Sequence, residues 1–442
     1  MLNKQTKESL NLIYDVASVT ANNINKSDKL TQLKQLYGTN IALHCHPANL
    51  VKAVLELDGV ANSVLLVPND ACELFLNRAE EKINLDFVLI DNSVNTKHWK
   101  VKTLNLADLF SLSDQEVSNK HQTNWLLATS GTTGTPKIVA HTIDSLTRTT
   151  ATAKNSKNLS WGLLYDPSRF AGFQVVLQAI LAANALIVPS PDLDFEKKIE
   201  YLVEKGCNAL SATPSLWRKI LMTTSATELK LTQITLGGEI ADQRILNSLA
   251  KKFPSATITH IFASTEAGVG FSVKDKNAGF PASWLKSGVR DVEMKISSEG
   301  TLCLKNTHKN QAYLGEKESI ADSAGWIDTG DLVEVENDRV FFKGRINGAI
   351  NIGGNKVIPE DVESVILNVS GVYQVLVRSK ASSIAGALVE ALVIPDPQLS
   401  DVSDLVKRIK SHCRQELPTF KVPAFVKLVE ELPVGTAGKI IR

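Results

Sequence analysis

Apolar and polar positions alternate in two different ways along this chain. Up to about residue 280, short apolar runs alternate with amphipathic stretches whose apolar positions recur every three or four residues. This alternation predicts parallel strands joined by helices that cover both faces of a sheet. The predicted strands are 40–46, 62–68, 86–91, 184–190, 234–239 and 257–264, and the predicted helices are 47–57, 71–82, 197–206 and 241–253.

Beyond residue 280 the apolar runs are shorter and polar turns separate them, which favours antiparallel strands at 292–297, 300–306, 332–338 and 339–344. A glycine-rich connection then leads to helices predicted at 359–369 and 402–417, with strands between them. We therefore expect an α/β fold. A large N-terminal domain, residues 1–346, has parallel or mixed sheets with flanking helices and a small β-barrel-like part. A small α+β C-terminal domain, residues 347–442, joins it near Asn347.

Composition and charge narrow the class of protein. Apolar residues make up 43% of the 442 residues, and 48 basic side chains nearly balance 47 acidic ones. This balance gives no support for bulk binding of nucleic acid or an acidic membrane. No apolar run is long enough to span a bilayer, and five scattered cysteines favour a reducing, cytoplasmic location. Neighbours in the strand-like run His44-Cys45-His46 point to opposite faces, which disfavours a metal site there.

One loop carries an unusual density of hydroxyl groups. The segment TSGTTGTPK runs from Thr129 to Lys137, directly after an apolar strand. Its glycines allow backbone N–H groups to turn toward a ligand, and its hydroxyls and lysine can bind phosphate oxygens. It differs from the Walker sequence, in which lysine follows the second glycine directly. Taken alone it could be a surface loop, but it predicts a phosphate cradle made by Thr129, Ser130, Gly131, Thr132, Thr133, Gly134 and Lys137.

The loop resembles the phosphate loop of the adenylate-forming superfamily, which includes acyl- and aryl-CoA synthetases, nonribosomal adenylation domains and luciferases. Four further stretches resemble that family's motifs, and all five occur in the family's order from Thr129 to Lys439. They are ITHIFASTEAG, GWIDTGDLVEV, FFKGRINGAINIGGNKVIPEDVE and PVGTAGKIIR. The resemblance implies that a carboxylate attacks the α-phosphate of ATP, and that a thiol then displaces AMP from the acyl-adenylate.

The resemblance also implies roles for residues around the nucleotide. Glu266 would bind Mg²⁺, which neutralises phosphate charge, and Thr265 would bond the α-phosphate. Phe262 stands where the family usually has an aromatic ring against adenine. Asp331 would accept both ribose hydroxyls, and Arg345 would bond the ribose or a phosphate.

In such enzymes a mobile C-terminal domain serves both half-reactions. Lys439 would bridge the carboxylate and the α-phosphate during adenylation. Rotation about a hinge at Asn347 would then bring Gly353 and Gly354 to the path of the thiol. Asn347 replaces the usual Asp or Lys, and Asn tolerates unusual dihedral angles. Asn351 replaces a lysine that supports thioester formation in many acyl and aryl ligases.

The acid pocket is expected in the segments DPSRFAGFQ, SATPSLW and TLGGEI and near the second motif. Arg169 could bond a polar group of the substrate or equally face solvent. No acid lies at the pocket position of FAGFQ, which disfavours an amino acid, and two adjacent glycines suggest room for a ring or an alkyl chain. We therefore favour an aryl or medium acyl acid. The candidate pocket residues are Arg169, Phe170, Gly172, Gly237, Gly238 and Ala263.

The acceptor of the acyl group stays open between two thiols. Only about 125 residues precede the hydroxyl loop, so we expect a trimmed N-terminal subdomain, as in compact aryl-acid ligases. Since only three residues follow Lys439, we expect no fused carrier domain. The sequence predicts an acid–CoA ligase, with a ligase that loads the phosphopantetheine of a separate carrier protein as the alternative. The third possibility is an inactive nucleotide-binding module. It is disfavoured by the joint presence of the residues with assigned roles Lys137, Glu266, Asp331, Arg345 and Lys439.

Overall fold

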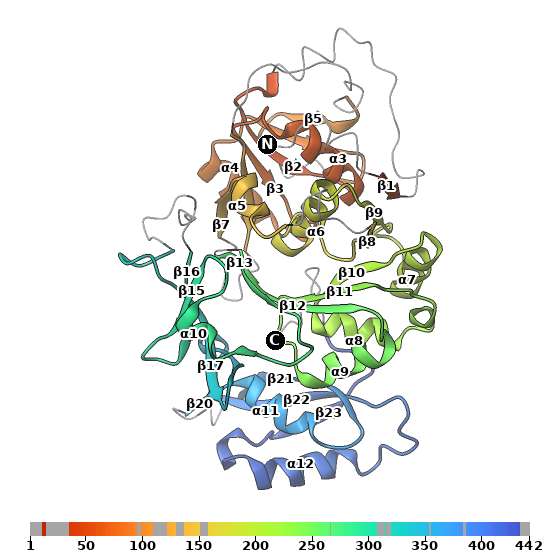
Figure 1. The fold of residues 1–442 in the computed structure, drawn as a ribbon, viewed down its shortest axis with the longest axis vertical. Coiled ribbons are helices and arrows are strands. Elements are labelled where there is room, and N and C mark those ends of the chain that lie inside the picture. Colours follow the sequence, from red (N-terminus) through yellow and green to blue (C-terminus); the bar gives the residue numbers. More distant parts are fainter. Residues whose placement is uncertain are drawn as a thin grey trace. The chain divides into compact units, whose positions relative to one another are not determined.

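The computed structural model describes residues 11–14, 35–94, 99–108, 122–129, 137–150, 158–265, 267–306, 314, 320–352, 355–382 and 386–433. The chain divides into two compact units, each with its own sheets (Figure 1). The predicted α/β class is confirmed, whereas the predicted domain boundary at Asn347 stays a prediction. The first unit comprises Met1–Glu239, Arg244–Lys276 and His308–Asp322, and the second comprises Ile240–Gln243, Asn277–Thr307 and Ser323–Arg442.

A six-stranded sheet forms the first part of the first unit, in the order β5-β4-β2-β3-β6-β7. All of its pairings are parallel except the last, in which β7 runs antiparallel to β6. The central strands are buried on both faces, as the continuous apolar runs predicted. The strands are β2 Asn40–His44, β3 Ser63–Leu66, β4 Phe87–Ile90, β5 Thr103–Asn105, β6 Asn124–Ala128 and β7 Ile138–His141.

A seven-stranded sheet forms the second part of this unit, in the order β1-β9-β8-β10-β11-β12-β13. It is parallel except for the edge strand β13, which pairs antiparallel with β12. Its strands are β1 Asn11–Tyr14, β8 Ser160–Gly162, β9 Ala185–Val188, β10 Ala209–Ala212, β11 Gln233–Gly237, β12 Thr257–Ser264 and β13 Gly268–Val273.

Helices connect these strands, and local sequence sets where several of them begin. Thr213 caps the helix that starts at Pro214, and Asp194 accepts a hydrogen bond from the backbone N–H of Lys197. Such caps satisfy N–H groups that have no partner within the helix. The helices are α3 Pro47–Leu57, α4 Glu73–Ile83, α5 Ile143–Thr147, α6 Phe170–Leu181, α7 Phe195–Glu204, α8 Pro214–Met222 and α9 Gln243–Lys252, with short 3-10 turns η3 Leu106–Asp108 and η5 Ser225–Thr227.

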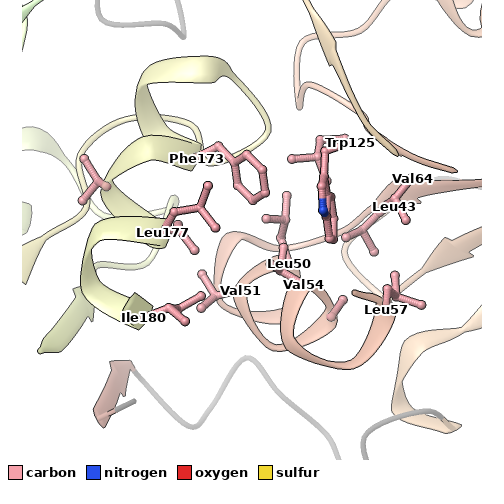
Figure 2. Close-up of a cluster of buried hydrophobic side chains, with 14 of the residues drawn as sticks. Leu43, Leu50, Val51, Val54, Leu57, Val64, Trp125, Phe173, Leu177 and Ile180 are labelled. Atoms are coloured by element: carbon pink, nitrogen blue, oxygen red, sulfur yellow. The ribbon is translucent and has the colours of Figure 1, made fainter. Parts of the chain in front are cut away.

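One hydrophobic core joins the two sheets of the first unit. The apolar face of α6 packs against that of α3, and the ring of Trp125 from β6 lies beside them (Figure 2). The ring centroids of Trp125 and Phe173 are 5.4 Å apart. The residues that Figure 2 labels are Leu43, Leu50, Val51, Val54, Leu57, Val64, Trp125, Phe173, Leu177 and Ile180. This shared core holds the two sheets together as one unit.

The second unit begins with an antiparallel sheet in the order β14-β18-β17-β16-β15. This is the region expected to be barrel-like, and the alternating pattern of β15 matches a half-buried strand. The elements are β14 Phe280–Pro281, α10 Trp284–Ser287, β15 Val292–Ile296, β16 Thr301–Asn306, β17 Ile327–Glu336, β18 Arg339–Arg345 and η6 Ile346–Gly348.

The last part of the chain forms an α+β layer within the second unit. Helices α11 and α12 cover one face of a three-stranded sheet in the order β21-β22-β23 (Figure 1). A two-stranded hairpin, β19-β20, precedes them. The elements are β19 Ile350–Ile352, β20 Asn355–Val357, α11 Pro359–Leu367, β21 Val372–Ser382, β22 Gly386–Pro395, α12 Leu405–Glu416, η7 Thr419–Lys421 and β23 Phe425–Leu428.

Candidate functional site

The carboxyl edge of the seven-stranded sheet gathers the residues assigned to the acid pocket. Strands β8, β10, β11 and β12 are parallel neighbours, so the segments that follow them leave the sheet at the same edge. In open α/β sheets this edge is where ligands bind. The segment after β8 carries Arg169, Phe170 and Gly172, the end of β11 carries Gly237 and Gly238, and the end of β12 carries Phe262, Ala263 and Thr265.

Glycine is present at the three predicted pocket positions for different structural reasons. A Cβ on Gly172 would lie 2.1 Å from the carbonyl oxygen of Asp166, so only glycine lets the first turn of α6 approach this loop. A Cβ on Gly237 would meet only the carbonyl oxygen of Ile261, at an ordinary 3.7 Å. Gly238 follows with a φ of +81°, a conformation that favours glycine. Packing therefore requires Gly172, whereas Gly237 leaves room at the end of β11.

The aromatic residue predicted beside adenine is held by a second ring. Phe262 on β12 pairs in register with Phe271 on β13, and their ring centroids are 5.3 Å apart with an angle of 13° between the planes. The pairing shifts by a β-bulge between Phe262 and Ala263. Bulges re-aim side chains near functional sites. Phe271 thus fixes one face of Phe262 at the point where the strand changes direction.

A buried histidine that the sequence analysis did not single out links the two sheets. His141 ends β7, which follows the hydroxyl loop, and its Nε2 donates to the carbonyl oxygen of Thr265 at 2.9 Å. Burial lowers the pKa of His141 to about 4, and the bond to Thr265 opposes this shift only in part. The ring is therefore neutral near pH 7, with its proton on Nε2 to serve Thr265. Its ring also packs on Phe170, with 5.8 Å between centroids.

The hydroxyl loop starts and ends on neighbouring antiparallel strands. The backbone N–H of Thr129 donates to the carbonyl oxygen of Lys137 at 2.8 Å, and the N–H of Lys137 donates to Thr129 Oγ1 at 3.1 Å. These two bonds close the base of the predicted phosphate cradle. The rest of the predicted loop, Ser130, Gly131, Thr132, Thr133 and Gly134, lies outside the described residues.

Arg169 neither faces open solvent nor stands alone. Its Nη2 lies 2.5 Å from Asp70 Oδ1, and only 15% of its side chain is exposed. Among the described residues, its buried Nε–H has no acceptor. The segment just before Arg169 is held by Asp166, whose Oδ1 accepts from the backbone N–H and the hydroxyl of Ser168. Sequence reasoning missed Asp70, which lies outside the quoted motifs, and it assigned no role to Asp166 although the pocket segment DPSRFAGFQ begins there.

Two further polar groups line the same edge. Tyr165 is buried, and its hydroxyl lies 3.5 Å from the carbonyl oxygen of Gly237. Burial, together with the nearby charge of Glu239, raises the pKa of Tyr165 far above its ordinary value, so the phenol stays protonated. Glu239 accepts a 2.9 Å hydrogen bond from the backbone N–H of Ser215 in the first turn of α8. A carboxylate at this position is stabilised by the helix dipole.

The side chains and backbone of the His44-Cys45-His46 run form hydrogen bonds with neighbouring segments. His44 accepts from the indole N–H of Trp99 at 3.4 Å, and the backbone N–H of His46 donates to Asp91 at 2.8 Å. Burial lowers the pKa of both imidazoles. Within the described ranges, no three His, Cys, Asp or Glu side chains form a group that could hold a metal ion.

In the second unit, the two residues predicted to hold the ribose lie side by side. Asp331 on β17 pairs in register with Arg345 on β18, and Arg345 Nε lies 3.2 Å from Asp331 Oδ1. Arg345 also donates to the carbonyl oxygen of Thr329, whose hydroxyl accepts from the N–H of Asp331. Gly330 between them has a φ of +69°. This part of β17, together with the end of β18, thus presents a carboxylate and a guanidinium side by side.

The predicted hinge and the remaining site residues are only partly described. Asn347 lies in the short turn η6, directly after β18. Gly353, Gly354, Glu266 and Lys439 lie outside the described residues, so their predicted roles stay predictions.

Two family profiles match the chain. The profile described as AMP-binding enzyme matches residues 29–314, and the profile described as AMP-binding enzyme C-terminal domain matches residues 361–439. Among curated proteins, the chain is similar to the D-alanine–D-alanyl carrier protein ligase of Staphylococcus aureus (strain Newman). The two are 24% identical over 408 residues, which cover 85% of this chain and 81% of that one.

Solved structures share the fold. The anthranilate CoA ligase AuaEII, in complex with anthranoyl-AMP, has a TM-score of 0.76 and 16% identity, covering 97% of this chain and 92% of that one. The o-succinylbenzoate CoA synthetase MenE of Bacillus subtilis, with OSB-AMP, has a TM-score of 0.71 and 18% identity, covering 98% and 94%. ATP-bound MatB of Rhodopseudomonas palustris has a TM-score of 0.75 and 18% identity, covering 94% and 89%.

In the part of the chain that the structure describes, no helix combines the length and the apolar character needed to cross a bilayer.

Proposed function

The chain belongs to the AMP-binding enzyme family, and from this premise we propose that it activates a carboxylic acid with ATP and passes the acyl group to a thiol. It is an adenylate-forming ligase. In the first step the carboxylate attacks the α-phosphorus, and pyrophosphate leaves with the electron pair of the broken P–O bond. In the second, the thiol sulfur attacks the acyl carbon, and AMP leaves with the electron pair of the broken C–O bond.

The hydrogen bond between His141 and Thr265 is the observation that carries this proposal. It joins the strand that follows the hydroxyl loop to the residue that precedes Glu266. Segments with separate phosphate-binding roles, far apart in the sequence, are thereby tied to one place. The loop would hold the β- and γ-phosphates, while Thr265 would bond the α-phosphate between them and the incoming acid.

Charge neutralisation is the main physical task of the first step, because two anions must meet. Lys439 would place its ammonium between the carboxylate and the α-phosphate, where negative charge builds in the transition state. Lys137, at the end of the hydroxyl loop, would add a second positive charge on the side of the leaving pyrophosphate. Both lysines can act in this way only if the phosphates lie along the hydroxyl loop. Because β6 and β7 flank this loop, their geometry determines where the phosphates bind.

Mg²⁺ fits the residues available for it. This ion is usually held by one or two carboxylates together with substrate phosphates and waters. Glu266 would be such a ligand, together with oxygens of the bound phosphates. When bound, the ion neutralises phosphate charge.

Asp331 and Arg345 would hold the ribose. A carboxylate can accept from both ribose hydroxyls, and Arg345 Nε, 3.2 Å from Asp331 Oδ1, helps to orient that carboxylate. Arg345 is more than half exposed, so this pair adds little to the stability of the fold. Its arrangement is instead suited to binding.

We propose an aryl or medium acyl acid as the substrate. Space at Gly237 and the aromatic wall of Phe170 at the carboxyl edge of the sheet support a flat or extended apolar group. An amino acid is the second candidate. Asp166 places a carboxylate at the same edge, and the similar Staphylococcus aureus protein is named as a D-alanine ligase.

The acceptor is proposed to be CoA, with a separate carrier protein as the alternative. Both present a phosphopantetheine thiol, and among the similar proteins are CoA ligases and a carrier protein ligase. The five cysteines occur as free thiols, which supports a location in a reducing cytoplasm.

A panel of acids assayed by pyrophosphate release tests the proposal. The panel contains benzoates, medium-chain fatty acids and small amino acids, each with ATP and Mg²⁺ and without thiol. We expect release with one class and none without acid. CoA or a holo carrier protein is then added to the active acid, and thioester formation identifies the acceptor. No release with any acid would indicate an inactive module and would reject the proposed reaction.

A further inference from the structure

The hairpin β19-β20 has one buried face and one exposed face. Ile350 pairs with Val357, and both are buried in the core of the α+β layer. The next pair along the hairpin is Asn351 with Lys356, and both of these residues are exposed. Because successive side chains in a strand point to opposite faces, Asn351 and Lys356 share the face that is turned away from the core.

The buried face holds this hairpin firmly. Val357 is fully buried and Ile350 is 6% exposed, and both belong to the cluster that includes Val362 of α11 and Ile409 of α12. Burying side chains of this size stabilises their position by about 1.5–3 kcal/mol each. The backbone that carries Asn351 and Lys356 is therefore held in place by the buried side of the hairpin.

Lys356 has no carboxylate partner among the described residues, unlike two other lysines of its unit. Lys421 Nζ lies 2.8 Å from Asp361, and Lys427 Nζ lies 3.0 Å from Glu390. Among the described residues, Lys356 forms no ion pair and no side-chain hydrogen bond. Its ammonium is thus available to an anion from outside the domain.

The pairing offers a reason for Asn351, which stands where many acyl and aryl ligases carry a lysine. Directly opposed residues of an antiparallel pair have their Cβ atoms about 5 Å apart. The flexible four-carbon stem of lysine can cover such a distance. An amine on Lys356 can therefore reach the region that an amine at position 351 would reach.

We propose that Lys356 supplies, from the opposite strand of the hairpin, the positive charge that thioester formation needs. This inference rests on the proposed function. When the thiolate sulfur attacks the acyl carbon, the C–O bond to AMP breaks and its electron pair moves onto the phosphate; the thiol proton is lost to solvent. Lys356 binds this phosphate as its charge grows, and Asn351 beside it donates a hydrogen bond without adding charge.

Substitutions that remove the lysine at position 356 and introduce one at position 351 test this assignment. In Lys356→Ala, thioester formation from pre-formed acyl-adenylate should fall about 100-fold, as when one stabilising donor is removed from an active site. Acid-dependent pyrophosphate release should stay unchanged. The double variant Lys356→Ala with Asn351→Lys should recover most of the lost rate. The matched control is Lys407→Ala, which removes an exposed lysine on α12 of the same unit.

The outcomes separate this inference from the proposed function. Full thioester formation in Lys356→Ala, or no recovery in the double variant, would overturn the role of Lys356 while pyrophosphate release still supports the ligase. No pyrophosphate release by the wild-type protein with any acid would instead reject the proposed function itself. An equal loss in both half-reactions, with a lowered thermal midpoint, would show that Lys356 has only a structural role.

Discussion

His141 Nε2 lies 2.9 Å from the carbonyl oxygen of Thr265, although 124 positions separate the two residues in the sequence. This bond joins the six-stranded sheet to the last long strand of the seven-stranded sheet. It also fixes the backbone next to Glu266, to which the sequence assigns the metal. The histidine thus sets the geometry around the proposed α-phosphate site without belonging to any of the five sequence motifs.

The lowered pKa of His141 predicts a specific dependence of stability on pH. Its folded pKa of about 4 is below the ordinary 6.5, so the unfolded chain binds the proton more tightly. The stabilisation is complete above pH 6.5 and is lost as pH falls toward 4, by about 1.4 kcal/mol per pH unit.

A glutamine at this position provides the comparison, because it keeps an N–H donor but does not titrate in this range. On going from pH 7.5 to 5.5, the urea midpoint of the wild-type protein should fall further than that of His141→Gln. Equal shifts in both proteins would mean that His141 does not carry the expected pKa.

Two glycine substitutions distinguish a glycine that the packing of the fold requires from one that shapes the acid pocket. Gly172→Ala places a Cβ 2.1 Å from the carbonyl oxygen of Asp166 and should destabilise the fold by about 1–3 kcal/mol. Gly237→Ala makes only an ordinary 3.7 Å contact and should leave the thermal midpoint unchanged. It should instead lower kcat/KM for the bulkier acids of the panel more than for the smaller ones. A uniform effect of Gly237→Ala on all acids would place this residue outside the pocket.

Recognition of the ribose can be tested at Asp331. Asp331→Asn removes a charged acceptor, so KM for ATP should rise about 10- to 100-fold. The effect should be much smaller with an ATP analogue that lacks both ribose hydroxyls. Glu334→Gln is the matched control, since Glu334 lies on the same strand and pairs with Lys343 at 3.0 Å. If the analogue and ATP respond alike, Asp331 does not contact the ribose.

The proposed role of Lys439 concerns only the first half-reaction. In Lys439→Ala, adenylation measured by pyrophosphate release should fall by several powers of ten. Thioester formation from pre-formed acyl-adenylate should largely survive, because another part of the C-terminal domain serves that step. A similar loss in both half-reactions would contradict the proposed rotation of the domain.

Local pattern was enough to predict many of the elements of the fold, although the helices α6 and α8 were not among them. The predicted strand 257–264 coincides with β12, and the predicted helix 47–57 coincides with α3. Both have strong local signals: a short run rich in β-branched residues in the first, and Pro at the first position of an amphipathic stretch in the second. The antiparallel strands after residue 280 were recognised by their polar turns in the same way.

The contacts that organise the candidate site could not be predicted in this way. The sequence does not decide whether Arg169 contacts the substrate or faces solvent, whereas in the structure Arg169 pairs with Asp70, 99 positions earlier. His141 and Asp166 likewise act through partners on other segments. Such pairings depend on how the two sheets pack through their shared core, and neither periodicity nor motif spacing encodes that packing.

Mass spectrometry of the nucleotide products tests the central claim most directly. Purified protein is incubated with ATP, Mg²⁺ and an active acid from the panel, first without a thiol and then with CoA or a holo carrier protein. The account predicts an acyl-adenylate with pyrophosphate in the first stage, and AMP with a thioester in the second. Formation of ADP and inorganic phosphate, or no acyl-adenylate with any acid, would contradict it.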